Sequence, residues 1–153
     1  MISFKHFFIE SDNISIQRIP NSDDYFDDED SDIDVENMSS YSYDLAKRTD
    51  LGITRDRELI AIALHNDDPV GAIWSSFEND TYAFDVAVEP KFQGTGIGSK
   101  LIDYGIDEFD NYSDIPDSVM EIDVTSSLTK NALERRGFHI IDNMGNNRWL
   151  MKK

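Results

Sequence analysis

The stretch from Thr81 to Lys100, TYAFDVAVEPKFQGTGIGSK, carries most of the information about the fold. Its first residues form an alternating run that is typical of a strand. Gly94, Gly96 and Gly98 then stand at every second position, although glycine is costly to keep ordered. The residues after the loop are apolar at helical spacing, namely Leu101, Ile102, Ile106 and Phe109. The stretch therefore predicts a strand, a glycine loop and a helix.

A loop of this kind can bind phosphate groups through its backbone. The first turn of a helix has N–H groups without an intrahelical acceptor and the positive end of the helix dipole. Glycine lets the main chain approach a pyrophosphate closely. The common nucleotide motifs do not fit, because a P-loop needs Gly-Lys-Ser or Gly-Lys-Thr where the chain has Gly98, Ser99 and Lys100. A dinucleotide fingerprint would need its third glycine one place later.

Apolar runs on both sides of this stretch predict the rest of a sheet. Runs at 58–67 and 70–78 form a hairpin around Asp67, Asp68 and Pro69. After a turn at Asn79 and Asp80, the run from Thr81 to Pro90 extends it to an antiparallel meander. Further strands are predicted at 4–10, 14–20, 119–124, 138–142 and 148–152, the last two around a turn at 143–147. Helices are predicted from Ser39 to a stop at Gly52, and at 127–137 with Gly137 at the end. The order predicts an α+β fold in which a crossover makes one pair of strands parallel.

Composition limits the class of protein. The 153 residues fit one domain, 1–153, and there is no cysteine for a disulfide or thiolate site. We expect a soluble cytoplasmic protein, since no apolar run has the length of a signal peptide core or a membrane span. Acidic residues number 31 against 14 basic ones, a net charge of −17. Such a field repels nucleic acids and anionic membranes and attracts cations.

The acidity is concentrated at residues 21–36, where nine of sixteen side chains are acidic and none is basic. We interpret this segment as an acidic loop or a short frayed helix. Asp28, Asp30, Asp32 and Asp34 alternate like calcium ligands, but Ile33 replaces the turn glycine and Ser39 replaces the closing glutamate. His6, His65 and His139 lack ligand spacing, so we predict no metal site.

The glycine loop resembles the acyl-CoA loop of the GNAT superfamily of N-acetyltransferases. The similarity begins with Val86 to Pro90, centres on Gln93 to Gly98, and includes the Arg-Arg-Gly-Phe sequence at 135–138. It covers roughly Leu59 to Phe138 with the elements in the family's order. The resemblance implies a mostly antiparallel mixed sheet with helices on both sides and a splayed parallel pair of strands, in which 120–124 diverges from 81–88.

The resemblance also implies acetyl-CoA as the cofactor and acetyl transfer to a primary amine as the activity. The backbone of Val86, Ala87 and Val88 would pair with the pantetheine arm, and an N–H group near Val88 would polarise the thioester carbonyl. The pyrophosphate would be held by the amides of Gln93, Gly94, Thr95, Gly96, Ile97, Gly98 and Ser99. One departure is Leu133, at the place where family members often have a tyrosine that acts as general acid. Tyr104, Tyr112, a water molecule or no acid at all would then serve.

Catalysis of amine acetylation requires a general base. A lysine-type amine with a pKa of about 10.4 costs roughly 4–5 kcal/mol to deprotonate at pH 7. Candidates beside the predicted slot are Tyr82, Asp85 and Glu78, and strand alternation places Tyr82 and Asp85 on opposite faces. Each is also compatible with an ordinary structural role.

The acceptor is the least constrained part of the prediction. In the family, the acceptor groove is made where the acidic segment of this chain falls, so we expect a cationic acceptor such as a polyamine, an aminoglycoside or a basic peptide. The alternative is a catalytically weak or inactive acidic protein that keeps the fold and binds a basic partner surface. The sequence leaves the oligomeric state open, a homodimer included.

Overall fold

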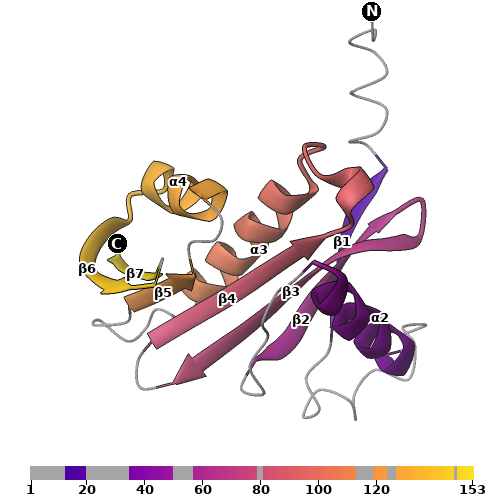
Figure 1. Ribbon diagram of the computed structural model, residues 1–153, viewed down its shortest axis with the longest axis horizontal. Helices are drawn as coiled ribbons and strands as arrows, with labels where there is room; N and C mark the ends of the chain where they lie inside the picture. Colours follow the sequence, from indigo (N-terminus) through magenta and orange to yellow (C-terminus); the bar gives the residue numbers. More distant parts are fainter. Residues whose placement is uncertain are drawn as a thin grey trace, which may run out of the picture.

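Figure 1 shows a computed structural model of the chain, which describes residues 13–19, 35–49, 57–78, 81–112, 119–123, 127–146 and 148–153. Within these residues a seven-stranded sheet has the strand order β1-β2-β3-β4-β5-β7-β6. The strands are β1 (Ile14–Arg18), β2 (Glu58–His65), β3 (Asp68–Glu78), β4 (Thr81–Val88), β5 (Val119–Asp123), β6 (His139–Gly145) and β7 (Arg148–Lys152). The helices are α2 (Val35–Arg48), α3 (Ile97–Tyr112) and α4 (Ser127–Arg135).

One junction of the sheet is parallel and short. β1 to β4 pair as an antiparallel series, and β7 pairs antiparallel with both β5 and β6. β4 and β5 are parallel, and their register contains only Thr81 with Val119, Tyr82 with Met120 and Ala83 with Glu121. The mixed sheet and the splayed parallel pair are therefore confirmed.

The larger apolar core lies between the sheet and α3, with α4 on the same side (Figure 1). Leu101, Ile102 and Ile106 of α3 are 0–1% exposed against β2, β3 and β4. Gly105 brings the helix close, because a Cβ there would lie 2.8 Å from Ile73 Cδ1. The apolar spacing seen in the sequence thus fixes α3 firmly on the centre of the sheet.

The opposite face carries a smaller core under α2. Leu45 and Ala46 pack with Ile62, Trp74 and Ala87, and Trp74 is fully buried. Helices on both faces of the sheet were predicted, and this is confirmed.

Four predicted boundaries were wrong in detail. The hairpin turn is Asn66–Asp67, with φ values of 50° and 67°, so Asp68 and Pro69 belong to β3. α2 begins at Val35, which moves Glu36 from the acidic loop into a first helical turn, where a carboxylate complements the dipole. α3 begins at Ile97, so Gly98, predicted as part of the glycine loop, lies inside the helix. β6 continues to Gly145, so residues 143–145 belong to the strand and not to the predicted turn.

Several predictions fall outside the described residues. These are the strand at 4–10, the acidic residues 21–34, the helix stop at Gly52 and the turn at Asn79 and Asp80. In the part of the chain that the structure describes, no helix has the length and apolar character needed to cross a membrane.

Candidate cofactor and active site

The glycine loop joins β4 to α3 through a short helical turn. Glu89 precedes the 3-10 turn η2 (Pro90–Phe92), and the Phe92 N–H donates to the Glu89 carbonyl at 2.9 Å. Gly94 and Gly96 have φ values of +82° and +91°, in the left-handed region that side chains rarely adopt. α3 begins at the next residue, Ile97. The glycines therefore turn the end of a strand into the start of a helix.

Within the part of the chain that the structure describes, most backbone donors of this loop have no acceptor. The Gln93 amide donates to the Pro90 carbonyl and the Thr95 amide to the Phe92 carbonyl, each at 3.3 Å. Lys100 makes the first hydrogen bond of α3, to the Gly96 carbonyl at 3.1 Å. Among the described residues, no backbone acceptor is found for the remaining amides, which belong to Gly94, Gly96, Ile97, Gly98 and Ser99.

These amides suit an anion. Ideal Cβ atoms added to Gly94 or Gly96 would meet nothing within 4 Å, so the loop surface is open above both glycines. The free donors of the first turn of α3 lie at the positive end of the helix dipole. A diphosphate group fits this donor set, because it supplies several acceptor oxygens and negative charge. The residues predicted to hold a pyrophosphate are thus brought together, although Gln93 and Thr95 use their amides within the loop.

The predicted slot for a pantetheine arm lies along the end of β4. In the described register, β5 pairs with β4 only as far as Ala83. The remaining residues, from Phe84 to Val88, extend about 16 Å at about 3.3 Å per residue. They lead directly to the glycine loop, and Val86, Ala87 and Val88 lie on this stretch.

A charged cluster holds the junction between β4 and the loop. Glu89 Oε1 accepts from the Tyr41 hydroxyl at 2.9 Å and from Arg48 Nη2 at 2.8 Å, and Glu89 Oε2 accepts from Arg48 Nη1 at 2.8 Å. Arg48 Nε also donates to Asp44 Oδ2 at 2.8 Å. We call Tyr41, Asp44, Arg48 and Glu89 the Glu89 cluster.

The cluster shifts the pKa values of its members. The hydrogen bond from Arg48 lowers the pKa of Glu89, against the opposing effect of partial burial. Burial raises the pKa of Tyr41, and its hydrogen bond to Glu89 adds to that effect. The pKa of Arg48 is raised, chiefly by its hydrogen bonds to Glu89 and Asp44. At neutral pH the cluster therefore contains an ionised Glu89, a neutral Tyr41 and a charged Arg48.

The three candidate bases lie in different places. Tyr82 is 1% exposed in the core under α3, with its ring 5.7 Å from that of Phe109. Asp85 is opposite Trp74 in the β3–β4 register, so it faces the α2 side, and its carboxylate lies 3.3 Å from Arg57 Nε. Glu78 is exposed at the end of β3. The structure separates Tyr82 and Asp85 by the sheet, as alternation predicted, and does not bring the three together.

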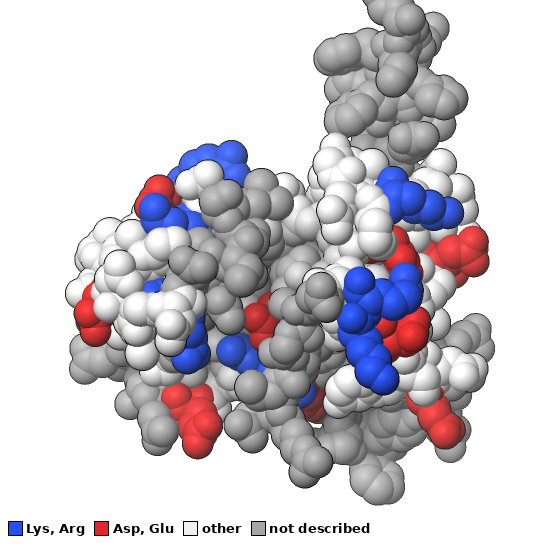
Figure 2. All heavy atoms as spheres, viewed as in Figure 1, with Lys and Arg blue, Asp and Glu red and all other residues white. Residues whose placement is uncertain are grey.

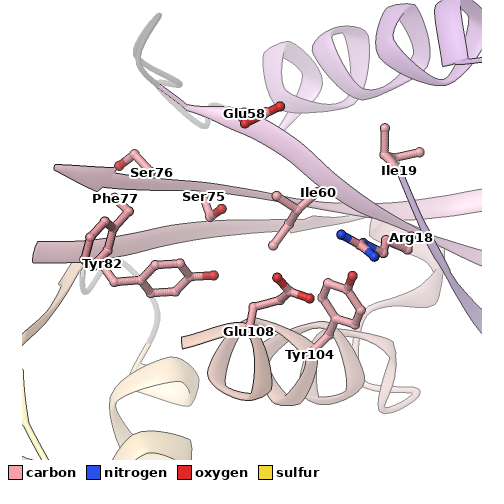
Figure 3. Close-up of a pocket in the computed structure, with 10 residues that line it drawn as sticks. All are labelled: Arg18, Ile19, Glu58, Ile60, Ser75, Ser76, Phe77, Tyr82, Tyr104 and Glu108. Atoms are coloured by element: carbon pink, nitrogen blue, oxygen red, sulfur yellow. The ribbon is translucent and has the colours of Figure 1, made fainter. Parts of the chain in front are cut away.

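A cavity of about 190 Å³ lies between α3 and the sheet, beside the ends of β1 and β3 and the starts of β2 and β4. Figure 3 shows Glu108 and Tyr104 rising from α3 toward the strands, with the Tyr82 hydroxyl and Arg18 directed into the same space. Glu108 stands eleven residues after Ile97, which is about 16 Å along the helix. The cavity is therefore distant from the glycine loop and close to the start of β4. Its other lining residues are Ile19, Glu58, Ile60, Ser75, Ser76 and Phe77.

Leu133 is fully buried in the core on the α3 side. Its carbonyl accepts from the Phe138 amide at 3.0 Å, and Gly137, with φ of +90°, closes the helix as predicted. A leucine at this place carries no proton to donate. Tyr104, one of the predicted substitutes, lines the cavity, and the side chain of Tyr112 lies outside the described atoms.

Sequence reasoning missed the partners of Glu89 and Asp85. Tyr41 and Arg48 are 48 and 41 residues from Glu89 in the chain. Arg57 stands at the edge of a predicted strand, with no local sign of its partner Asp85. The only available signal was an ion-pair candidate at Asp44 and Arg48, four residues apart on the helix, which says nothing about Glu89.

Comparison with known proteins identifies a family and a fold for the chain. The sequence matches the Acetyltransferase (GNAT) family over residues 16–138. No curated protein sequence matches the chain.

Solved structures with the same fold cover nearly the whole chain. Ard1 from Thermoplasma volcanium has a TM-score of 0.55 at 13% identity, over 91% of this chain and 95% of that one. The IAA acetyltransferase from Bacillus cereus ATCC 14579 has a TM-score of 0.52 at 17% identity, over 90% and 97% of the two chains. Arabidopsis thaliana Naa50, in complex with the bisubstrate analogue CoA-Ac-MVNAL, has a TM-score of 0.52 at 16% identity, over 92% and 98%. These similarities establish the fold, and the match over residues 16–138 shows that the chain belongs to the acetyltransferase (GNAT) family.

Proposed function

We propose that the protein is an acetyl-CoA-dependent N-acetyltransferase that acts on a primary amine of a cationic acceptor. One observation carries the proposal. The amides of Gly94, Gly96 and Ile97–Ser99 have no acceptor among the described backbone groups, at the end of a strand that has parted from β5. An open row of donors beside an open strand edge suits a ligand with a diphosphate and an extended amide-bearing arm.

The donor half of the site would use backbone groups. The loop amides would hold the diphosphate, and Val86, Ala87 and Val88 would align the arm by strand-like hydrogen bonds. Bound acetyl-CoA supplies an activated acetyl group as a thioester. A neutral amine must attack its carbonyl carbon, the carbon–sulfur bond breaks, and the departing sulfur receives a proton.

The acceptor half must remove a proton from the ammonium group. Tyr82, Asp85 and Glu78 remain the proposed bases. Asp85 lies on the α2 face with Arg57 at 3.3 Å, and its side chain is 10% exposed. If Asp85 or Glu78 is the base, Asp85→Asn or Glu78→Gln should change the acidic limb of the pH profile of kcat/KM. Tyr82→Phe should test the tyrosine in the same assay.

The preference for a cationic acceptor rests on charge. The net charge of −17 attracts cations, and the acidic segment directly precedes α2. Changing Asp27, Asp28, Asp30 and Asp32 to Asn should raise the acceptor KM and remove its salt dependence.

The cavity at the start of β4 is a second proposed contact for the ammonium group. Glu58 and Glu108 supply two carboxylates there against the one guanidinium of Arg18, and Tyr82 and Tyr104 supply hydroxyls. Glu108→Gln should then raise the acceptor KM without changing CoA affinity. Asp107→Asn is the matched control, since Asp107 is the preceding helix residue, 71% exposed, and contacts Arg136.

The direct test uses acetyl-CoA with a panel of amines and measures thiol release. Polyamines, an aminoglycoside and a basic peptide should be acetylated, whereas neutral amines of similar size should react poorly. Thermal shift with CoA tests the donor site alone, since ligand at 100 times Kd adds about 2.7 kcal/mol of stability. Absence of any shift would remove the proposal.

Buried Leu133 favours a second candidate function, a protein that keeps the cofactor site without rapid turnover and binds a basic partner surface. That candidate predicts CoA binding with no thiol release across the whole panel. Turnover with any amine at rates typical of enzymes would exclude it.

A further inference from the structure

Glu89 lies next to the glycine loop. It is the last residue before the turn that leads into the glycine loop, and its amide donates to the Val70 carbonyl at 2.8 Å. Its side chain is 18% exposed. An ionised carboxylate at this point acts against binding of a diphosphate to the neighbouring amides, because like charges repel over distances within a Debye length.

The structure provides a specific compensation for this charge. Arg48 approaches Glu89 with two parallel N–H contacts of 2.8 Å, the geometry in which a guanidinium binds a carboxylate most strongly. Tyr41 adds a third hydrogen bond at 2.9 Å. Asp44 holds the remaining side of the guanidinium through Nε at 2.8 Å. Figure 2 shows basic side chains gathered around acidic ones over α2.

The charge that compensates Glu89 comes from a different element of the fold. Tyr41, Asp44 and Arg48 belong to α2, whereas Glu89 belongs to the β4–loop junction. The exposed Lys91 is the other cation that acts on Glu89, and its ammonium group lies 5.1 Å from the centre of the Phe92 ring. α2 is thus the only described helix that contacts the Glu89 carboxylate by hydrogen bonds.

We propose that Arg48 of α2 masks the charge of Glu89 and thereby sets the affinity of the glycine loop for a diphosphate-bearing cofactor. Arg48 acts through Glu89, so it is a positioning residue of the donor site. The inference rests on the proposed function only in taking the loop as the diphosphate site.

A masking role and a purely structural role for Arg48 predict different changes in CoA affinity. If Arg48 masks Glu89, Arg48→Ala exposes the carboxylate and should weaken CoA binding roughly threefold to tenfold at low salt. Glu89→Gln removes the charge and leaves Arg48 in place, so CoA should bind equally well or more tightly. A purely structural cluster would lose affinity in both variants.

The experiment measures CoA binding by isothermal titration calorimetry for the wild type, Arg48→Ala, Glu89→Gln and the double variant Arg48→Ala/Glu89→Gln. The double variant should recover wild-type affinity within about twofold, because no bare carboxylate remains. Asp44→Asn is the matched control, since it removes the other carboxylate partner of Arg48 and leaves the Glu89 contacts intact. It should bind CoA like the wild type.

Two further readouts separate masking from a general disturbance. The defect of Arg48→Ala should shrink at about 0.5 M salt, where exposed charges are screened. It should also be absent when acetyl-pantetheine, which has no phosphate, replaces acetyl-CoA as the donor. Circular dichroism melting without ligand checks that each variant is folded.

The outcomes are distinct. Equal losses with acetyl-CoA and acetyl-pantetheine, or failure of the double variant to recover, would overturn the masking role. A wild type that binds CoA but acetylates no amine would remove the proposed activity, while the binding series would still decide the role of Arg48. A wild type that binds no CoA would remove both.

Discussion

The two faces of the sheet are held by different kinds of interaction. On the α3 side, fully buried aliphatic side chains and a glycine contact press the helix against β3 and β4. On the α2 side, a smaller apolar cluster is supplemented by the Glu89 cluster and by Arg57 with Asp85. Apolar packing responds little to pH or to moderate changes in ionic strength, whereas ionic contacts respond to both. The α3 face therefore acts as scaffold, and the α2 face is where the site can be tuned.

The largest expected effect comes from the scaffold. Leu101→Ala removes a fully buried side chain of α3 and should lower the free energy of unfolding by about 3–5 kcal/mol. Leu45→Ala, the equally buried counterpart on α2, should cost about 2–3 kcal/mol, because its smaller cluster can collapse more easily. Urea denaturation measures both. A larger loss of stability for Leu45→Ala than for Leu101→Ala would show that the α2 face, and not the α3 face, is the main scaffold.

A second comparison concerns strained glycines. Gly96→Ala places a side chain at φ of +91°, which costs about 1–2 kcal/mol, and the loop should relax away from its donor geometry. We expect CoA affinity to fall about fivefold or more. Gly145→Ala is the matched control, with φ of +75° and no neighbour within 4 Å. It should lose stability without losing CoA affinity, and equal affinity losses would show that the loop has no special role.

Gly105 tests how tightly α3 lies on the sheet. Gly105→Ala gains helix propensity, yet its Cβ would lie 2.8 Å from Ile73 Cδ1 and 3.3 Å from the Phe84 ring. The net loss of stability should be about 1 kcal/mol. Ile73→Val removes the clashing Cδ1 atom, so the double variant should be more stable than the sum of the single changes predicts. Strict additivity in a thermal unfolding cycle would contradict the close contact.

The smallest expected effect concerns the α2 face and pH. Because Arg48 lowers the pKa of Glu89, the ionised carboxylate stabilises the fold above the ordinary glutamate pKa of about 4.3. That contribution disappears as the pH falls through the lowered pKa. The stability difference between wild type and Glu89→Gln should therefore be constant from pH 7 to about pH 5 and shrink below that. Chemical denaturation across this pH range measures the difference in the free energy of unfolding. A difference that grows on acidification would contradict a lowered pKa of Glu89.

The sequence predicted the elements whose signals are local. Leu101, Ile102 and Ile106 at helical spacing identified α3, and Gly137 identified the end of α4. The start of α2 was placed too late, because the acidic residues before Ser39 were interpreted as a loop although Glu36 suits a first helical turn. The hairpin turn was predicted too late in the chain because proline is a common turn residue and Pro69 was assigned to it. The turn is formed by Asn66 and Asp67, which tolerate positive φ.

The site was predictable only where the backbone forms it. The spacing of the glycines locates the amides without an acceptor, because the φ angles and the start of the helix determine which backbone N–H groups remain unpaired. Contacts such as Arg48 with Glu89 depend on how α2 lies across the sheet, and no local pattern encodes a pairing over 41 residues. The same holds for Arg57 with Asp85 on β4.

The three residue pairs between β4 and β5 have a mechanical consequence. They divide the sheet into a four-strand plate and a three-strand plate, and Arg136, the residue after α4, pairs with Asp103 of α3 at 2.6 Å and with Asp107 at 3.2 Å. The larger core crosses this junction, because Met151 of β7 and Leu133 of α4 lie in the same buried cluster as Ile73 of β3. Rotation of one plate against the other would have to break this packing, so we expect the width of the gap beside β4 to be fixed by the shared core and not by the few strand pairs.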